Sequence, residues 1–163
     1  MRLVWFFGIL SLALLIGLAV YLLPLNPSIV VLQFCFRPES FQAVMTEWQP
    51  PGVALFRSHL PVDFVLLMSY GLFGYLLSMR NTVLRRYLAR RPRYLRLLMP
   101  LAACADAVED GLHWVFTGNG GEAWMWLVPL AAICSCIKFT GITLFGIAVW
   151  RAHRSTPKFQ IAP

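Results

Sequence analysis

The feature that most constrains this chain is a polar face inside an apolar stretch. Residues 97–117 are apolar enough to cross a bilayer, yet they include Asp106, Glu109, Asp110 and His113. At helical spacing these four residues lie at i, i+3, i+4 and i+7, so they share one face. A charge near the centre of a bilayer costs on the order of 2.5–3.5 kcal/mol. The polar face therefore predicts either a site or a set of buried ion pairs.

Composition places the chain among integral membrane proteins. Its 163 residues are 59% hydrophobic and only 13% charged, and the mean hydropathy is +0.68. The net charge of +7 invites nucleic-acid binding, but the positive residues gather in residues 80–96 and in the C-terminal tail, without a nucleic-acid-binding motif. We expect the Arg80–Arg96 loop to contact the anionic head groups of membrane lipids, with a short surface helix over residues 82–89, and we expect no nucleic acid.

Four apolar stretches predict four transmembrane helices, at residues 3–25, 62–79, 97–117 and 124–150. The basic loop 80–96 joins the second and third, and positive loops stay in the cytoplasm. With four spans, both termini then lie on the cytoplasmic side. We therefore predict one domain over residues 1–163, an all-α membrane protein with a four-helix transmembrane bundle.

Residues 26–60 are predicted to form a short amphipathic helical cap on the outer side. Residues 29–36 are a short apolar run, either extended or lying on the bilayer surface. A helix that starts at Pro38 then carries an apolar stripe of Phe41, Val44, Met45 and Trp48. Pro50-Pro51 ends this helix, and a second short helix over residues 53–60 leads into the second span.

Helix rise places Lys138 of the fourth span at the depth of Asp106. Asp106 lies ~14 Å along the third span and Lys138 ~21 Å along the antiparallel fourth, so both are near the middle. We predict an ion pair between Lys138 and either Asp106 or Glu109. Such a pair can fix the register of the bundle and do nothing else.

Carboxylates outnumber the lysine in this region. Asp63, near the start of the second span, is predicted at the level of His59 and His113, and it adds a fourth acid. One lysine offsets one carboxylate, so the remaining acids need protons, hydrogen bonds or a ligand. The predicted binding residues are His59, Asp63, Tyr70, Asp106, Glu109 and Lys138.

Two alternative uses of these residues stay open. Acid–base catalysis on a lipid has the candidates Glu109, Asp110 and His113. Metal binding has the candidates His59, Asp63, Asp110 and His113, a donor set that suits zinc or iron, although we predict no cofactor. The sequence contains no serine-hydrolase, metalloprotease, P-loop or dinucleotide motif that would name a reaction.

Several segments resemble a family of small four-span bacterial inner-membrane proteins. The residues that carry the resemblance are Arg57 to Phe64 (RSHLPVDF), Tyr70-Gly71, Ala105-Asp106-x-x-Glu109-Asp110 and Lys138. In that family the acidic motif more often reads Asp-x-x-Glu-Asn, so Asp110 is a departure. The resemblance implies the same topology, the same polar groups and a location in the bacterial inner membrane, and it implies no reaction.

Three functions are consistent with this pattern. The first is an integral membrane protein whose buried acidic, histidine and lysine cluster binds a lipid-like ligand or a membrane partner. The second is an intramembrane enzyme that acts on a lipid by acid–base or metal-dependent chemistry. The third is a structural subunit of a larger membrane complex. We favour the first, and its expected partners are membrane lipids and either another membrane protein or a second copy of the chain.

Overall fold

The computed structural model describes residues 1–89, 91 and 93–154, and all regular structure in that part of the chain is helical. The helices are α1 (Arg2–Tyr21), α2 (Ile29–Gln33), α3 (Pro38–Arg80), α4 (Thr82–Ala89), α5 (Leu98–Phe116) and α6 (Val128–Arg154). Short 3₁₀ helices cover Arg93–Arg96 and Gly121–Leu127. The all-α prediction is confirmed, and so is the helix over residues 82–89. Arg90 of the basic loop and the tail after Arg154 lie outside the described residues.

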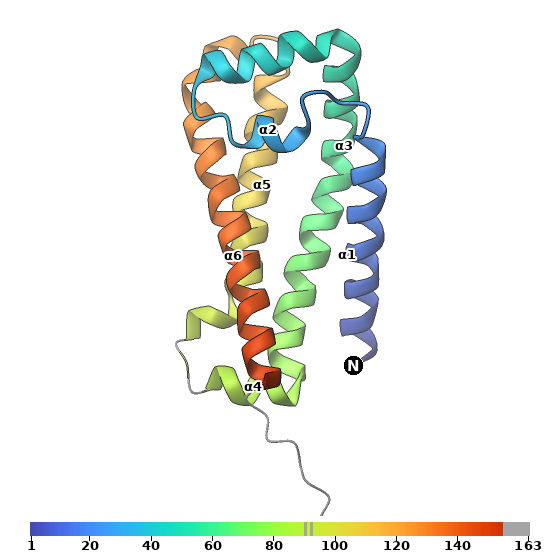
Figure 1. Ribbon diagram of the computed structural model, residues 1–163, viewed down its shortest axis with the longest axis vertical. Helices are drawn as coiled ribbons and strands as arrows, with labels where there is room; N and C mark the ends of the chain where they lie inside the picture. The colour runs from blue at the N-terminus through green and yellow to red at the C-terminus, as the bar shows by residue number, and fades with distance from the viewer. Residues whose placement is uncertain (90, 92, 155–163) are drawn as a thin grey trace, which may run out of the picture.

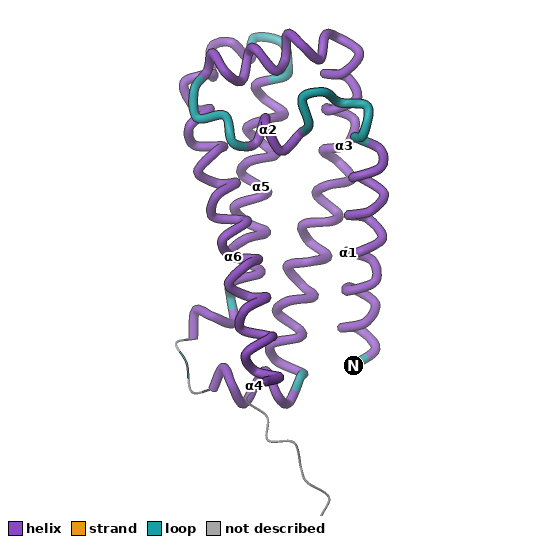
Figure 2. The backbone as a smooth tube through the Cα atoms, viewed as in Figure 1, coloured by secondary structure: helices purple, strands orange, loops and turns teal. Residues whose placement is uncertain are grey.

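Four long helical segments stand side by side, and short elements close the two ends (Figures 1 and 2). α5 packs against both α3 and α6, whereas α3 and α6 have little contact with each other. α1 packs along α3. We call the end with α2 and the first part of α3 the cap end, and the end with α4 the basic end.

α3 consists of two parts that meet at a kink. Gln49 has non-helical dihedral angles, φ 54° and ψ 175°, and Pro50 and Pro51 follow it. A proline has no N–H to donate and clashes with the preceding turn, which explains why the first part ends here. The first part lies across the cap end, and the second runs the length of the bundle (Figure 1). The predicted helix from Pro38 to the proline pair is confirmed, and its stripe residues Phe41, Val44 and Trp48 are buried.

Three predicted boundaries are wrong. The first helix ends at Tyr21 rather than at residue 25, because Pro24 disfavours continuation of the helix. Residues 53–60 and 62–79 form one unbroken helix, since α3 passes through Pro61 with the loss of a single backbone hydrogen bond. The last helix begins at Val128 rather than Trp124, because the preceding residues form a 3₁₀ helix. Residues 29–36, left open as extended or surface-bound, contain α2.

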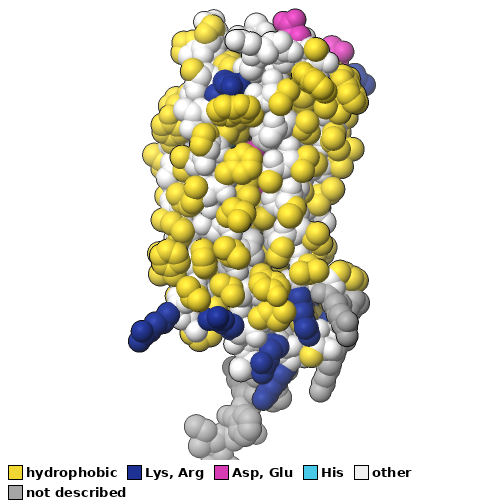
Figure 3. Space-filling model, turned by 180° about the vertical axis from the view of Figure 1, so that it is seen from behind, with side chains coloured by type: hydrophobic (Ala, Val, Ile, Leu, Met, Phe, Trp, Pro, Cys, Tyr) yellow, Lys and Arg dark blue, Asp and Glu magenta, His cyan; other side chains and the backbone are white. Residues whose placement is uncertain are grey.

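On the face shown in Figure 3, the exposed charged side chains lie toward the two ends, and a broad apolar belt separates them. Three helical segments are long and apolar enough to cross a membrane, namely Arg2–Tyr21, Pro38–Arg80 and Gly121–Arg154. The 19-residue α5 is not in this set, because it carries three acidic residues.

Small residues lie where the long helices approach one another. A Cβ atom added at Gly74 of α3 would lie 2.2 Å from Cγ of Met99 in α5, and one at Gly141 of α6 would lie 3.1 Å from Cβ of Ala102. Large apolar side chains such as Met68 instead point outward. At the cap end the pattern reverses, and a cluster that includes Phe41, Trp48 and Phe56 is buried. The close helix contacts bring α3 and α6 against the polar face of α5.

Candidate functional site

The polar face of α5 meets a lysine from α6. Nζ of Lys138 lies 2.7 Å from Oδ1 of Asp106 and 2.9 Å from Oε2 of Glu109. The exposed fractions of these residues are 5%, 4% and 0%, respectively. Asp106 and Glu109 are one helical turn apart, so one ammonium group reaches both carboxylates. The predicted ion pair is therefore confirmed, and the lysine lies between two acids rather than beside one.

α3 contributes a second half to the site. The hydroxyl of Tyr70 donates a hydrogen bond to Oδ2 of Asp106 over 2.8 Å. Asp63, two turns before Tyr70, lies on the same face of α3, and carboxyl oxygens of Asp63, Asp106 and Asp110 are all within 4.8 Å of one another. We call the whole group the polar cluster, which consists of Asp63, Tyr70, Asp106, Glu109, Asp110 and Lys138.

The polar cluster has more negative than positive groups. Four of its members are acids, and Lys138 is the one cation that pairs with them among the described residues. Oδ2 of Asp110 has no hydrogen-bond partner, although the residue is only 2% exposed. A buried carboxylate without a partner is costly, and close carboxylates repel each other unless a proton or another cation lies between them. The cluster can therefore accept further positive charge.

His113 lies in an aromatic environment rather than in the polar cluster. Its ring stacks on Phe41 with the centroids 5.7 Å apart and packs edge-on against Phe56, also at 5.7 Å. It makes no hydrogen bond or ion pair with a carboxylate of the described chain. The three predicted catalytic candidates therefore do not form one hydrogen-bonded group, although Glu109 and Asp110 are neighbours on α5.

His59 is likewise packed against an aromatic ring. Its ring lies 4.8 Å from that of Phe56, centroid to centroid, and its Nδ1 is hydrogen-bonded to the Phe56 carbonyl. Of the four predicted metal candidates, only Asp63 and Asp110 come together, and their third neighbour is Asp106. The predicted metal set combined Asp63 and Asp110 with the two histidines, whereas the structure combines them with Asp106. The seven-residue spacing from Asp63 to Tyr70 was the available signal, since it puts both residues on one face.

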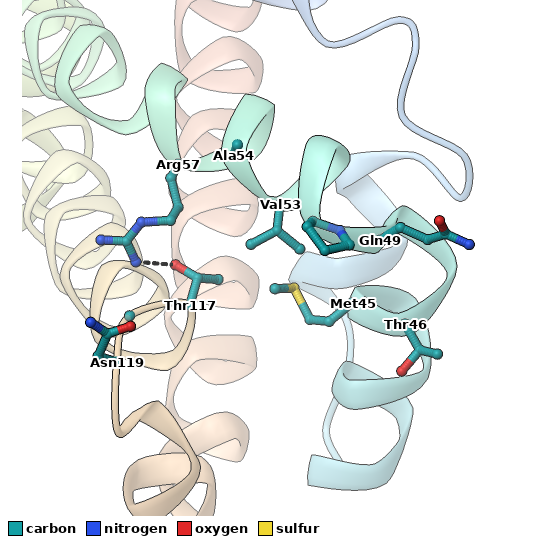
Figure 4. A pocket seen from close by; sticks show the side chains of 10 residues that line it. Met45, Thr46, Gln49, Val53, Ala54, Arg57, Thr117 and Asn119 are labelled. Carbon is teal, nitrogen blue, oxygen red and sulfur yellow. Dashed lines mark hydrogen bonds between the residues drawn. The ribbon is translucent and has the colours of Figure 1, made fainter.

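A hollow of about 740 Å³ opens at the cap end, between the kink of α3 and the turn after α5 (Figure 4). Its lining includes Met45, Thr46, Gln49, Pro50, Val53, Ala54, Arg57, Thr117, Gly118 and Asn119. Nη1 of Arg57 donates to the Trp114 carbonyl over 2.9 Å and to Oγ1 of Thr117 over 2.8 Å. The arginine thus satisfies a carbonyl in the last turn of α5, a common way to finish a helix. No member of the polar cluster lines this hollow.

No protein-family model, curated protein or solved structure matches this chain. The family resemblance therefore stays a prediction, and the chemistry of the site rests on its geometry.

Proposed function

We propose that this chain is an integral membrane protein with four spans, and that its polar cluster binds a lipid-like ligand from the bilayer. The membrane part of the proposal is supported by three long apolar segments and by the apolar belt between two charged ends. Side chains such as Ile9, Met68 and Ile137 are 64%, 60% and 49% exposed on this belt. A belt of this extent suits contact with lipid, because soluble proteins rarely leave so large an apolar surface in water.

The path of the chain supports α5 as the fourth span. α3 ends at the basic end and α6 begins near the cap end, so α5 returns over the same distance (Figure 1). At 1.5 Å per residue its 19 residues extend over about 28 Å, close to the hydrocarbon thickness of a bilayer. Its acids face the other helices, which removes the main objection to placing them in lipid.

Cysteine labelling tests this topology. Asn81→Cys places a single thiol at the basic end, directly after α3, and Asn119→Cys places one at the cap end, in the turn after α5. Both variants are made in a chain whose four native cysteines are replaced by alanine. In intact cells, an impermeant maleimide is expected to label the cysteine at position 119 and to spare the one at position 81. Labelling of both, or of neither, would show that α5 does not cross the membrane.

The basic end is proposed to lie in the cytoplasm of a bacterial cell, against anionic lipid head groups. α4 buries Leu84 and Leu88 and leaves Arg85 and Arg86 exposed. Arginine near the surface attracts anionic lipids, and positive loops remain on the cytoplasmic side. The N-terminus and the end of α6 lie at the same end of the bundle (Figure 1).

The surplus of carboxylates carries the binding part of the proposal. The contacts of Lys138 with Asp106 and Glu109 account for two acids, and they hold α5 against α6. Asp63 and Asp110 are left without a cation in the described chain, and Oδ2 of Asp110 is unpartnered. We call Lys138, Asp106 and Glu109 the lysine half of the polar cluster, and Asp63, Asp106 and Asp110 the aspartate half, so that Asp106 belongs to both. A purely structural role would be served by the lysine half alone, because each extra buried acid adds cost. The aspartate half is therefore assigned to a ligand that brings positive charge.

Native mass spectrometry of protein released gently from lipid nanodiscs tests the binding function. We expect a bound mass on the wild-type chain that is lost in Asp110→Asn, which keeps the shape of the side chain and removes its charge. Glu122→Gln is the matched control, because Glu122 is an exposed acid outside the polar cluster. A bare wild-type chain, or a bound mass that Asp110→Asn retains, would contradict binding at this site.

A further inference from the structure

We infer that the ligand of the polar cluster carries a primary ammonium group, held by Asp63, Asp106 and Asp110. This inference rests on the proposed function and names the class of its ligand. The three carboxyl oxygens face one another, and the unpartnered Oδ2 of the buried Asp110 belongs to the same group of acids. An ammonium group that bears one alkyl chain has three N–H donors, one for each of three acceptors.

The protein itself contains the precedent for this recognition. In the lysine half of the cluster, the ammonium of Lys138 already contacts two carboxylates at 2.7 and 2.9 Å. The contact with Asp106 is a hydrogen bond of ordinary charge-assisted length, whereas the contact with Glu109 is an ion pair without hydrogen-bond geometry. The aspartate half offers the same acceptor type, with Asp106 and Asp110 on the same helix and Asp63 on α3, and no ammonium group lies between Asp63 and Asp110 in the described chain. A second ammonium would balance charge there as Lys138 does one turn away.

One ammonium group can reach all three carboxylates. Their oxygens lie within 4.8 Å of one another, which is compatible with a shared nitrogen at about 2.8 Å from each oxygen. A quaternary ammonium has no N–H to donate and is recognised by aromatic rings, whereas this group consists of carboxylates.

Asp63 indicates how the ligand enters. It is half-buried, whereas the other three acids of the polar cluster are buried. Phe64 and Val62 beside it are both 41% exposed on the apolar surface. An amine at Asp63 would therefore leave its alkyl chain against this surface, which is the arrangement of an amphiphile. A phosphate next to the amine would be repelled by the carboxylates, so a ligand with an amine and no anion fits best.

Three probes with one chain length and different head groups test the inference. They are dodecylamine, dodecyltrimethylammonium and 1-dodecanol, each titrated against the full chain in nanodiscs and followed by native mass spectrometry. We expect one dodecylamine to be retained, with at least tenfold weaker retention of the other two. Asp110→Asn is expected to weaken dodecylamine about tenfold or more, because it removes a charge-assisted contact. Glu122→Gln is expected to change nothing.

The outcomes separate this inference from the function on which it rests. Equal retention of the three probes would overturn amine recognition, and so would displacement of dodecylamine by millimolar Mg²⁺, Ca²⁺ or Mn²⁺. If a co-purified mass still disappears in Asp110→Asn, the polar cluster remains a binding site for another ligand. Asp110→Glu guards against a folding defect, because it keeps the charge, and amine retention should recover in part. If neither the probes nor co-purified molecules bind, both proposals are contradicted.

Discussion

The cap end and the middle of the bundle bury different kinds of side chain. At the cap end the buried residues are large, with Phe41 and Phe56 at 1% and 0% exposure. In the middle, several contacts between helices involve small or ionised residues, such as Gly71 against Ala103 and Lys138 against Asp106. Large apolar residues such as Met68 and Ile137 point outward there.

This contrast indicates which solvent each region meets. Burial of apolar surface is favourable only if the alternative is water, so under the proposed membrane placement the aromatic core stabilises a region outside the bilayer. In lipid, an exposed isoleucine loses nothing, and helices associate through close packing and polar contacts. The comparison predicts that the same type of mutation will have different effects in the two regions.

The largest expected effect is the loss of the cation in the middle. Lys138→Met leaves Asp106 and Glu109 buried without their partner, and we expect the free energy of unfolding to fall by about 5 kcal/mol. Unfolding in mixed micelles by dodecyl sulfate, followed by helical circular dichroism, measures this change. Adding Asp106→Asn should restore part of the loss, since one of the two unpaired carboxylates is then gone. A double mutant no more stable than Lys138→Met would argue against direct coupling of the pair.

A slightly smaller effect is expected from the core of the cap end. Phe56→Ala removes a fully buried ring that packs against Trp48, His59 and His113, and we expect a loss of about 4 kcal/mol in the same assay. Phe64→Ala, on the outward face of the same helix, is the matched control and should cost well under 1 kcal/mol, because Phe64 is 41% exposed. Similar losses for the two variants would refute the distinction between the regions.

The sequence alone predicted the helices and the contact of Lys138 with the acids of the third span. Apolar runs and prolines located the helices, and helix rise placed Lys138 beside Asp106, since depth is a property of each helix alone. Asp63 and Asp110 were predicted together as metal candidates, but the position of Asp106 beside both was not, because it depends on the rotation of α3 about its axis. Rotation is set by close contacts such as Gly74 with Met99, which involve residues far apart in the chain. The stacking of His113 on Phe41 was missed for the same kind of reason.

An intermediate effect is expected where helices touch. Gly74→Ala adds a Cβ atom 2.2 Å from Cγ of Met99, so α3 and α5 must move apart, and we expect a loss of about 2 kcal/mol. Gly146→Ala is the control, because its new Cβ atom would have no neighbour within 4 Å and the helix gains from alanine. Unfolding of the two variants in mixed micelles compares them directly. Equal stability would mean that close approach of α3 and α5 contributes little.

The smallest effect is expected on the apolar belt. Ile9 of α1 is 64% exposed, and Ile9→Ala should change the free energy of unfolding by less than about 0.5 kcal/mol in micelles, because the lost contacts are with lipid-like chains. Leu32→Ala in the core of the cap end removes a side chain of similar size that is only 1% exposed, and it should cost about 3 kcal/mol. The ratio of these two losses in the free energy of unfolding indicates whether Ile9 is surrounded by lipid-like chains or by protein. If Ile9→Ala cost as much as Leu32→Ala, the belt would be covered by protein rather than by lipid, and the four-span arrangement would need a partner at α1.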